Sequence, residues 1–277
     1  MRVGILGLGA MGAAMAGRLA DTGETPLGFD LDPARVNAAC CVAAADAASL
    51  CAASDLVLLS LPTEAAVLAS TTVFVGAAPA DALLVDCSTV SPATARAVAA
   101  QASASGRAAL DAPVSGGPAG AAAGTMAMMV GGEAAALDRA RPVLERLARR
   151  IVHVGPAGAG AVAKLVNNAL VATHMLVAAE AVRAARAAGV DPQALLQAVN
   201  GASGRSAATE VNFPRWILSG TFDSGFSAGL MRKDLRLAES VVAEGTLLAA
   251  ALAAWKESAV PDAEDFNRVA AARMGTK

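Results

Sequence analysis

Lys164 is the side chain in this sequence best suited to catalysis. Its neighbours at positions 162, 163, 165 and 166 are apolar, and Asn168 follows four positions later. In a helix, residues four apart lie on one face, so the amine and the amide would project together. An ammonium group among apolar side chains loses solvation, which prepares a lysine to give or accept a proton.

A structural interpretation of Lys164 also fits the spacing: its methylene stem would be buried while its amine reaches water. The residues that precede Lys164 help to choose between the structural and the catalytic interpretation. The glycine-rich lead-in Gly155-Pro156-Ala157-Gly158-Ala159-Gly160 would let another surface come close to the start of the helix. This lead-in favours the catalytic interpretation.

The N-terminal residues have the pattern of a dinucleotide-binding turn. An apolar run at 2–6 leads into Gly7-Leu8-Gly9-Ala10-Met11-Gly12, a small-residue helix follows, and a second apolar stretch ends on Asp30. In such a turn Gly7 makes the tight bend, Gly9 lets backbone N–H groups approach a pyrophosphate, and Gly12 lets the helix pack closely on the sheet. The glycines alone are a weak signal, but strand, glycines, helix, strand and terminal acid in this order predict a bound dinucleotide.

Asp30 also predicts which dinucleotide binds. A carboxylate at the end of the second strand can bond both hydroxyls of the adenosine ribose, and it repels the 2′-phosphate of NADP. Asp30 is followed by Leu31, Asp32 and Pro33, and the nearest cation is Arg35. We therefore expect NAD as the cofactor, with NADP disfavoured.

Three loops that follow apolar runs are candidates for holding ligands. Ser115-Gly116-Gly117, within the segment Asp111 to Pro118, would expose backbone N–H groups and a hydroxyl to a carboxylate, although a plain tight loop fits the same residues. Leu61-Pro62 and Ser88-Thr89 come directly after apolar runs. Ligands of parallel sheets bind beyond the carboxyl ends of the strands, which favours both pairs.

Other polar residues have weaker signals. Lys233-Asp234 lies in a late helical run and on its own fits a solvated face. His153 alternates with valines and is expected to be structural, and His174 lies roughly 80° around the helix from Lys164, which makes it a poor partner. For a last group of residues nothing indicates which of them face a pocket: Arg205, Phe213, Arg215 and Trp216.

An α/β scaffold is needed to position the N-terminal candidates. Apolar runs recur at 2–6, 25–29, 56–60, 83–87, 107–111, 125–131 and 151–154. Alanine-rich helical segments lie between several of them, at 10–21, 33–40, 92–104 and 133–149. This alternation predicts βαβ units and a mostly parallel sheet.

The strand pattern stops after residue 155. A long helix is predicted from about 158 to 188, with Gly189 as its C-terminal cap and Asp191-Pro192 opening the next helix. Further helices are predicted at 192–200, 207–218, 228–244, 246–257 and 262–274. The expected fold is therefore α/β: an N-terminal Rossmann-type parallel-sheet domain, residues 1–156, and an all-α domain, residues 157–277, joined by a long interdomain helix.

Composition argues against several classes of function. The 277 residues carry a net charge of −2 with scattered basic residues, so neither nucleic acid nor an anionic membrane is expected as a partner. Glycines or prolines break the N-terminal apolar run and the uncharged stretch 112–132, so neither is expected to be a signal peptide or a membrane span. Four cysteines without C-x-x-C spacing and two histidines predict no metal site and suit the cytoplasm.

Four of these segments together resemble the β-hydroxyacid dehydrogenase family. They are the glycine turn continued through Ala16, the segment from Asp111 to Gly120, the helix start from Gly158 through Lys164 to Asn168, and Met231-Arg232-Lys233-Asp234-Leu235. Their order along the chain is also that of the family. The resemblance covers nearly the whole chain and is specific for the family, though not for one substrate.

The resemblance implies a role for each candidate. Lys164 is implied as the general acid/base and Asn168 as a substrate-positioning residue, while Ser115, Gly116 and Gly117 hold a substrate carboxylate. The residues implied to contact the nicotinamide half of the cofactor are Leu61, Pro62, Thr89 and Lys233. Ala66 departs from the pattern, because some relatives have an asparagine near the cofactor there. The family also implies homodimers or homotetramers built on the helical domain.

The implied reaction is hydride transfer between NAD and a small 3-hydroxy carboxylic acid such as 3-hydroxyisobutyrate. A reductase of small aldehyde acids (succinic semialdehyde, glyoxylate or tartronate semialdehyde) would use the same residues, although Asp30 disfavours the NADPH that such relatives often prefer. An imine reductase shares the architecture but usually lacks a lysine at position 164. A non-catalytic NAD(H)-binding module would be expected to have lost Lys164, Asn168 or the Ser-Gly-Gly segment, and all three are present.

Overall fold

The computed structural model describes residues 1–275 of the chain. It divides into two compact units, Met1–Lys164 and Leu165–Lys277. The division falls inside helix α8 (Ala159–Ala187), the long helix expected from the sequence. We describe each unit by itself.

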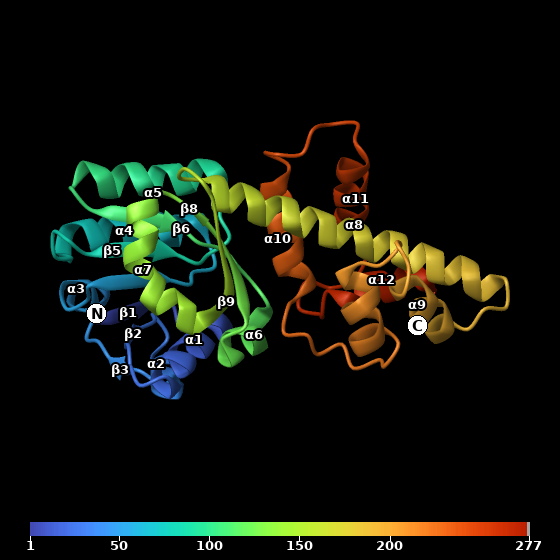
Figure 1. Ribbon diagram of the computed structural model, residues 1–277, viewed down its shortest axis with the longest axis horizontal. Coiled ribbons are helices and arrows are strands. Elements are labelled where there is room, and N and C mark those ends of the chain that lie inside the picture. The colour runs from blue at the N-terminus through green and yellow to red at the C-terminus, as the bar shows by residue number, and fades with distance from the viewer. Residues whose placement is uncertain (276–277) are drawn as a thin grey trace. The chain divides into compact units, whose positions relative to one another are not determined.

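The first unit is built on one twisted sheet (Figure 1). Its strands are β1 (Val3–Leu6), β2 (Leu27–Phe29), β3 (Val42–Ala43), β4 (Leu56–Leu59), β5 (Leu83–Asp86), β6 (Ala108–Asp111), β7 (Val114–Ser115), β8 (Met126–Gly131) and β9 (Ala148–Gly155). Their order is β3-β2-β1-β4-β5-β6-β8-β7, with β9 paired to β8. The strands from β3 to β6 are parallel, and β8 runs antiparallel to β6 and β7. This is the mostly parallel sheet that the sequence predicts.

The register of the parallel strands brings their carboxyl ends into one row. Leu6 of β1 pairs with Phe29 of β2 and with Leu59 of β4, Leu59 pairs with Asp86, and Asp86 pairs with Asp111. The chain leaves β1 in one direction across the sheet and later continues from β4 in the other, so the crevice outside β1 and β4 is a topological switch point. Ligands of open α/β sheets bind at such a crevice.

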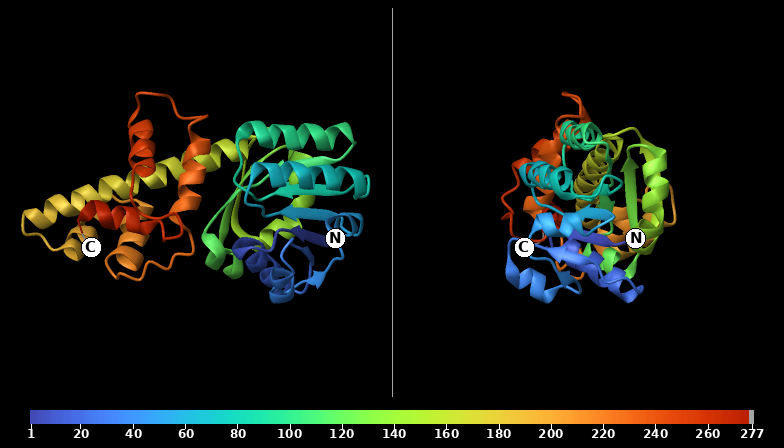
Figure 2. Two further views of the ribbon diagram at one scale, coloured as in Figure 1. Left: turned by 180° about the vertical axis from the view of Figure 1, so that it is seen from behind. Right: turned by 90° about the vertical axis from the view of Figure 1, so that its left-hand side faces the viewer.

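Helices cover both faces of this sheet (Figures 1 and 2). One face carries α1 (Ala10–Asp21), α6 (Gly117–Ala123) and α7 (Ala134–Leu147), and the other carries α3 (Ala47–Ala52), α4 (Glu64–Ala77) and α5 (Pro92–Ala104). A hydrophobic core lies on each face of the sheet, and successive strand residues point into opposite cores. Ile5, Leu58 and Val85 are buried on the first face, and Leu6, Leu59 and Leu84 on the second. The strands are continuously apolar because both of their faces are buried.

The sequence pattern missed several short or unpatterned elements. It does not predict β3, β7, α3, α4 or α6, and it places the end of α2 (Pro33–Ala38) at residue 40. It also extends the helix at 133–149 two residues too far, because β9 begins at Ala148. Helix α4 is mainly apolar on all sides, so it lacks the period of a surface helix. Its start is marked by the Thr63 side chain, which accepts from the N–H of Ala66, and by Glu64 in the first turn.

Helices build the second unit, as expected. Beyond α8 they are α9 (Pro192–Asn200), the π-helix η1 (Ala208–Ile217), α10 (Ala228–Ala238), α11 (Leu247–Lys256) and α12 (Asn267–Met274). Helix α10 stops six residues before the predicted end at 244, and α12 starts five residues after the predicted start at 262. The core surrounds Trp255, which is fully buried and donates its indole N–H to the carbonyl oxygen of Ala172 at 3.0 Å.

Helix α8 is long and apolar enough to cross a membrane by length and composition alone. Half of its most apolar stretch is buried inside the protein. The core helix of a soluble protein passes the same test, so this feature is only a weak indication of a membrane span.

Candidate active site

The glycine turn between β1 and α1 has three glycines in three different environments. Gly7 has φ +91°, and a Cβ atom there would lie 2.3 Å from the carbonyl oxygen of Ser60. A Cβ atom at Gly12 would lie 1.9 Å from the carbonyl oxygen of Gly7, so this glycine packs helix α1 against the turn itself. At Gly9 a Cβ atom would meet nothing within 4 Å. Two of the glycines are therefore required by packing, and Gly9 leaves an open cradle above the turn.

Asp30 follows β2 at the same edge of the sheet and is held by backbone donors. Its carboxylate accepts from the N–H of Leu8 at 2.8 Å and from the N–H of Asp32 at 2.9 Å, and Arg35 lies 3.6 Å away. Burial raises the pKa of Asp30, but the two N–H donors and the Arg35 guanidinium outweigh it, so the pKa of the carboxyl lies below its usual range. The group is ionised at neutral pH. In this structure the N–H of Leu8 is therefore hydrogen-bonded to Asp30.

The loops after β4 and β5 are bonded to each other. The hydroxyl oxygen of Ser88 accepts from the N–H of Leu61 at 2.9 Å, and the N–H of Ser88 donates to the carboxylate of Asp86 at 2.9 Å. Asp86 and Ser88 are buried, while Pro62 is exposed and Thr89 is half-buried. Leu61, Pro62 and Thr89 therefore lie on the same edge as the glycine turn, on loops that a hydrogen bond joins.

Ser115-Gly116-Gly117 joins the short strand β7 to helix α6. Gly116 and Gly117 have φ values of +128° and +64°, which favour glycine. No side chain caps the first turn of α6, and Ser115 pairs with Ala127 on β8. Gly116 is exposed, and Ser115 and Gly117 are half-buried. The segment is thus a turn with positive φ angles at the surface, where a loop can present N–H groups.

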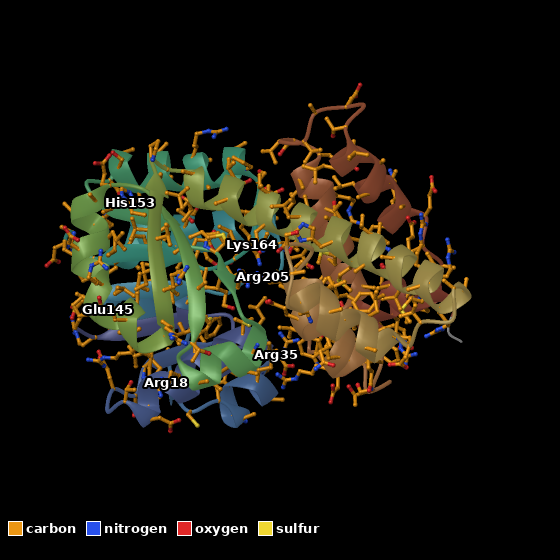
Figure 3. All side chains as sticks on the ribbon, turned by 45° about the vertical axis from the view of Figure 1, so that its right-hand side comes forward. Arg18, Arg35, Glu145, His153, Lys164 and Arg205 are labelled. Carbon is orange, nitrogen blue, oxygen red and sulfur yellow. The ribbon has the colours of Figure 1, made fainter. Side chains whose placement is uncertain are left out.

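Lys164 is buried on helix α8, with 8% of its surface exposed (Figure 3). It stands one turn after the start of the helix, and Asn168 follows one turn later, also buried at 4%. Burial fits the catalytic interpretation of Lys164 better than a lysine whose amine reaches water. The α8 segment supplies both residues from consecutive turns.

In the second unit, Asp234 connects two of the candidate residues. Its carboxylate accepts from the side-chain amide of Asn168 at 2.7 Å and lies 3.1 Å from the amine of Lys233. The carbonyl oxygen of the Asn168 side chain accepts from the amide of Asn167 at 3.1 Å, so both ends of the Asn168 amide are held. Asn168 and Lys233 thus come together on one buried acid.

Sequence reasoning missed Asp234 as a site residue and assigned it to a solvated face. The structure buries it at 3% exposure. A signal was present: Asp234 lies three positions after Met231 and four before Ala238, on the face of α10 that Met231 and Ala238 bury. An acid on the apolar face of a helix needs a partner, and here Asn168 and Lys233 supply it.

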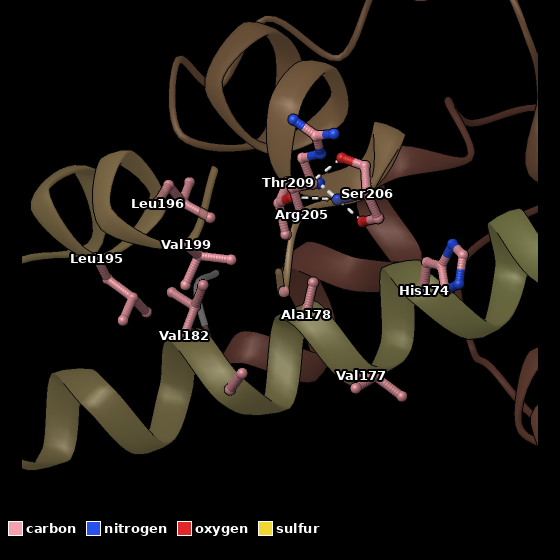
Figure 4. Close-up of a pocket in the computed structure, with 12 residues that line it drawn as sticks. His174, Val177, Ala178, Val182, Leu195, Leu196, Val199, Arg205, Ser206 and Thr209 are labelled. Carbon is pink, nitrogen blue, oxygen red and sulfur yellow. Dashed lines mark hydrogen bonds between the residues drawn. The ribbon is translucent and has the colours of Figure 1, made fainter. Parts of the chain in front are cut away.

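The remaining candidates have structural or peripheral places. His153 on β9 bonds the carbonyl oxygen of Gly132 at 2.8 Å, as a structural histidine would. Phe213 is fully buried in the helical core, and Arg215 stacks on Trp216 at 5.1 Å. Arg205 and His174 line a pocket of about 220 Å³ within the helical unit, whose wall is mainly apolar (Figure 4).

The first unit has the features that a dinucleotide needs. Gly9 leaves room for the pyrophosphate, the first turn of α1 has no side-chain cap, and the ionised Asp30 can accept from ribose hydroxyls. Within residues 1–275, no three His, Cys, Asp or Glu side chains are grouped so as to hold a metal ion.

Comparison with known families agrees with this geometry. Residues 2–155 match the family model described as the NAD binding domain of 6-phosphogluconate dehydrogenase. Residues 158–266 match the model described as NAD-binding of NADP-dependent 3-hydroxyisobutyrate dehydrogenase. This chain belongs to the β-hydroxyacid dehydrogenase family.

Individual relatives cover most of the chain. A probable 3-hydroxyisobutyrate dehydrogenase of Mycobacterium tuberculosis is 41% identical over an alignment of 250 positions, which covers 87% of this chain and 85% of that protein. The NAD-dependent L-serine dehydrogenase of Pseudomonas aeruginosa is 41% identical over an alignment of 252 positions, which covers 86% of this chain and 84% of the relative. A solved structure of the M. tuberculosis 3-hydroxyisobutyrate dehydrogenase with L-serine has a TM-score of 0.91 and 38% identity, and covers 98% of both chains. The resemblance inferred from the sequence is confirmed, and the chain is an NAD(P)-dependent hydroxyacid dehydrogenase.

The different environments of the glycines predict different effects of the same substitution. Gly9→Ala should leave the fold intact, because the new methyl group meets no protein atom, but it should raise the Kd for NAD by roughly tenfold or more by occupying the cradle. Gly12→Ala should lower the free energy of unfolding by about 1–3 kcal/mol through overpacking. Chemical denaturation and NADH fluorescence titration measure the two quantities.

Gly17 provides a matched control on the same helix. A Cβ atom there also meets nothing within 4 Å, so Gly17→Ala should stabilise helix α1 by about 0.5–1 kcal/mol and leave the Kd for NAD unchanged. If Gly9→Ala binds NAD as tightly as Gly17→Ala does, the cradle is not where the pyrophosphate sits.

Proposed function

We propose that the enzyme transfers a hydride between NAD and a small 3-hydroxy carboxylic acid similar to 3-hydroxyisobutyrate, with Lys164 as general acid/base. The observation that carries this proposal is the buried Lys164 at 8% exposure, one turn before an Asn168 that Asp234 holds in place. The named relatives support the substrate class: 3-hydroxyisobutyrate and L-serine both have a hydroxymethyl group on the carbon next to the carboxylate.

In the proposed mechanism, Lys164 moves the proton. During oxidation its neutral amine accepts the proton of the substrate hydroxyl, and during reduction its ammonium donates that proton to the developing alkoxide. Asn168 positions the hydroxyl, and Ser115, Gly116 and Gly117 hold the carboxylate so that one carbon is aligned for reaction. When bound, the nicotinamide accepts or supplies the hydride.

We propose NAD over NADP because Asp30 is ionised and stands at the end of β2. A 2′-phosphate would bring a second negative charge to this carboxylate. The same proposal includes the residues that contact the nicotinamide half of the cofactor: Leu61, Pro62, Thr89 and Lys233.

We further propose that residues 1–156 form the NAD-binding domain and residues 157–277 the substrate and oligomerisation domain. The two matched ranges, 2–155 and 158–266, support this division. The proposed assembly is a cytoplasmic homodimer or homotetramer without nucleic-acid or membrane partners. Exposed apolar residues on α8, Leu170 at 42% and Val177 at 60%, support contact with a second copy.

Lys164→Ala should lower kcat by a factor on the order of 10²–10⁴, the usual range for a lost general acid/base, with little change in the Kd for NADH. Steady-state oxidation of 3-hydroxyisobutyrate and fluorescence titration of NADH measure these. Lys256→Ala, at the end of α11, is the matched control and should retain wild-type turnover. A Lys164→Ala enzyme with near-wild-type kcat would remove this residue from the mechanism.

Cofactor choice should follow Asp30. We expect kcat/KM for NAD to exceed that for NADP, and the double substitution Asp30→Ser with Leu31→Arg should narrow or reverse the ratio. Leu31 is 92% exposed, so an arginine there meets no packing obstacle, and Leu31→Arg alone is the control that leaves the carboxylate in place. A wild-type enzyme that already prefers NADP would refute the assignment of Asp30.

The carboxylate of the substrate should contribute much of the catalytic efficiency. Isobutanol has the carbon skeleton of 3-hydroxyisobutyrate but no carboxylate, and we expect its kcat/KM to be lower by about 100-fold or more. Ser115→Ala should raise KM for the acid and leave KM for NAD unchanged. Substitution of Gly116 is a poorer test, because φ of +128° would strain any side chain. Equal efficiency with acid and alcohol would disprove the proposed carboxylate site.

A further inference from the structure

Asp111, at the end of β6, is a buried acid to which the proposed mechanism gives no role. It is 5% exposed. Its carboxylate accepts two backbone hydrogen bonds from the start of helix α8: from the N–H of Gly158 and from the N–H of Ala161, both at 2.8 Å. The N–H of Ala161 is a donor that an N-cap side chain usually satisfies, yet here its acceptor lies 50 residues earlier in the chain.

We propose that Asp111 is a positioning residue of the reaction, whose carboxylate fixes the first turn of α8, and with it Lys164, relative to the Ser115-Gly116-Gly117 segment. Lys164 stands one turn after Ala161, which donates to Asp111. On the other side, Asp111 is followed directly by the residues that lead to Ser115. The inference rests on the proposed role of Lys164.

Two glycines make this contact possible. A Cβ atom at Gly131 would lie 2.5 Å from a carboxylate oxygen of Asp111. A Cβ atom at Gly160 would lie 2.3 Å from the carbonyl oxygen of Met129 and 2.6 Å from that of Asp111. The start of α8 therefore lies directly against β6 and β8, and only glycine at both positions leaves room for the carboxylate between them.

Strand β8 contacts both the start of α8 and the Ser115-Gly116-Gly117 segment. The N–H of Met129 donates to the carbonyl oxygen of Pro113 at 3.1 Å, and Ser115 pairs with Ala127. One strand thus holds the residues before Gly116 and also contacts Gly160 on α8. A change in how α8 begins would alter the distance between Lys164 and the proposed carboxylate site.

The helix does not need Asp111 merely in order to form. Helix α8 has 29 residues, several of them buried in the core of the second unit, and packing of that kind stabilises a helix far more than one cap does. The carboxylate instead fixes where the first turn lies. Its charge faces the positive end of the helix dipole, which makes an anion suitable at this place.

Burial of the ionised Asp111 carboxylate makes the free energy of unfolding depend on pH. Burial raises the pKa of Asp111, although the N–H groups of Gly158 and Ala161 lower it in part. A carboxyl group with a raised pKa contributes most to the stability of the fold when protonated. Its contribution falls as the pH rises from the ordinary carboxyl pKa to the raised one.

The test compares Asp111→Asn with the matched control Asp191→Asn. Asn has the shape of Asp but keeps only one acceptor, so it can hold one of the two N–H groups. Asp191 caps α9 through the N–H of Ala194 at 3.0 Å, and α9 carries none of the proposed site residues. With 3-hydroxyisobutyrate and NAD, Asp111→Asn should lower kcat by about 10- to 100-fold and leave the Kd for NADH unchanged, whereas Asp191→Asn should keep wild-type kcat.

A double-mutant cycle separates positioning from a general loss of structure. If Asp111 acts through Lys164, adding Asp111→Asn to Lys164→Ala should change the residual rate by less than about twofold. Hydrogen exchange of the peptide covering 158–164 should be faster in Asp111→Asn than in the wild type. If Asp111→Asn fails to fold, Asp111→Ser, which also keeps one acceptor, takes its place in every measurement.

Three results would overturn the inference: wild-type kcat in folded Asp111→Asn, an equal loss in the wild-type and Lys164→Ala backgrounds, or unchanged exchange at 158–164. A failure of the proposed function is distinguishable, because Lys164→Ala would then keep its activity while the exchange measurement still reports whether Asp111 holds α8.

Discussion

A parallel sheet delivers the carboxyl ends of its strands to one edge, and this constraint arranges the first unit. The paired residues Leu6, Leu59, Asp86 and Asp111 form one row, and each is followed by a loop with a proposed ligand role or a link to one. Because both faces of the sheet are covered by helices, the edge is where backbone donors and polar side chains can meet a ligand. The glycine turn, Asp30, Leu61 and Thr89 owe their common location to the register of the strands.

Close backbone approach is the second requirement, and glycines satisfy it in two ways. Gly12 and Gly160 are glycines because a carbonyl oxygen occupies the place of a side chain. Gly9 is different, since nothing in the protein fills the space beside it. Packing therefore explains the first two glycines, whereas Gly9 is best explained by a ligand. The sequence pattern already assigns Gly9 to the ligand and Gly12 to packing, and the structure adds the carbonyl oxygens that leave no room for a side chain at Gly160.

Buried acids organise the candidate residues in both units. Asp111 holds the start of α8 through two backbone donors, and Asp234 holds Asn168 and Lys233. A buried carboxylate is costly unless it is hydrogen-bonded, and each of these has its partners among residues of the proposed site or next to them. Rigid support of this kind keeps reacting groups within the narrow geometry that hydride and proton transfer require.

The sequence by itself determined the alternation of strands and helices, the glycine turn with Asp30, and the long helix with Lys164 and Asn168, because these depend on local periodicity and short spacing. It did not reveal α4, whose apolar residues surround the helix, or the burial of Asp234. Only the tertiary structure decided that Asp111 caps a helix about fifty residues away and that Asp234 meets Asn168. Such contacts join residues far apart in the chain, and no local pattern encodes which distant donor will satisfy a buried acid.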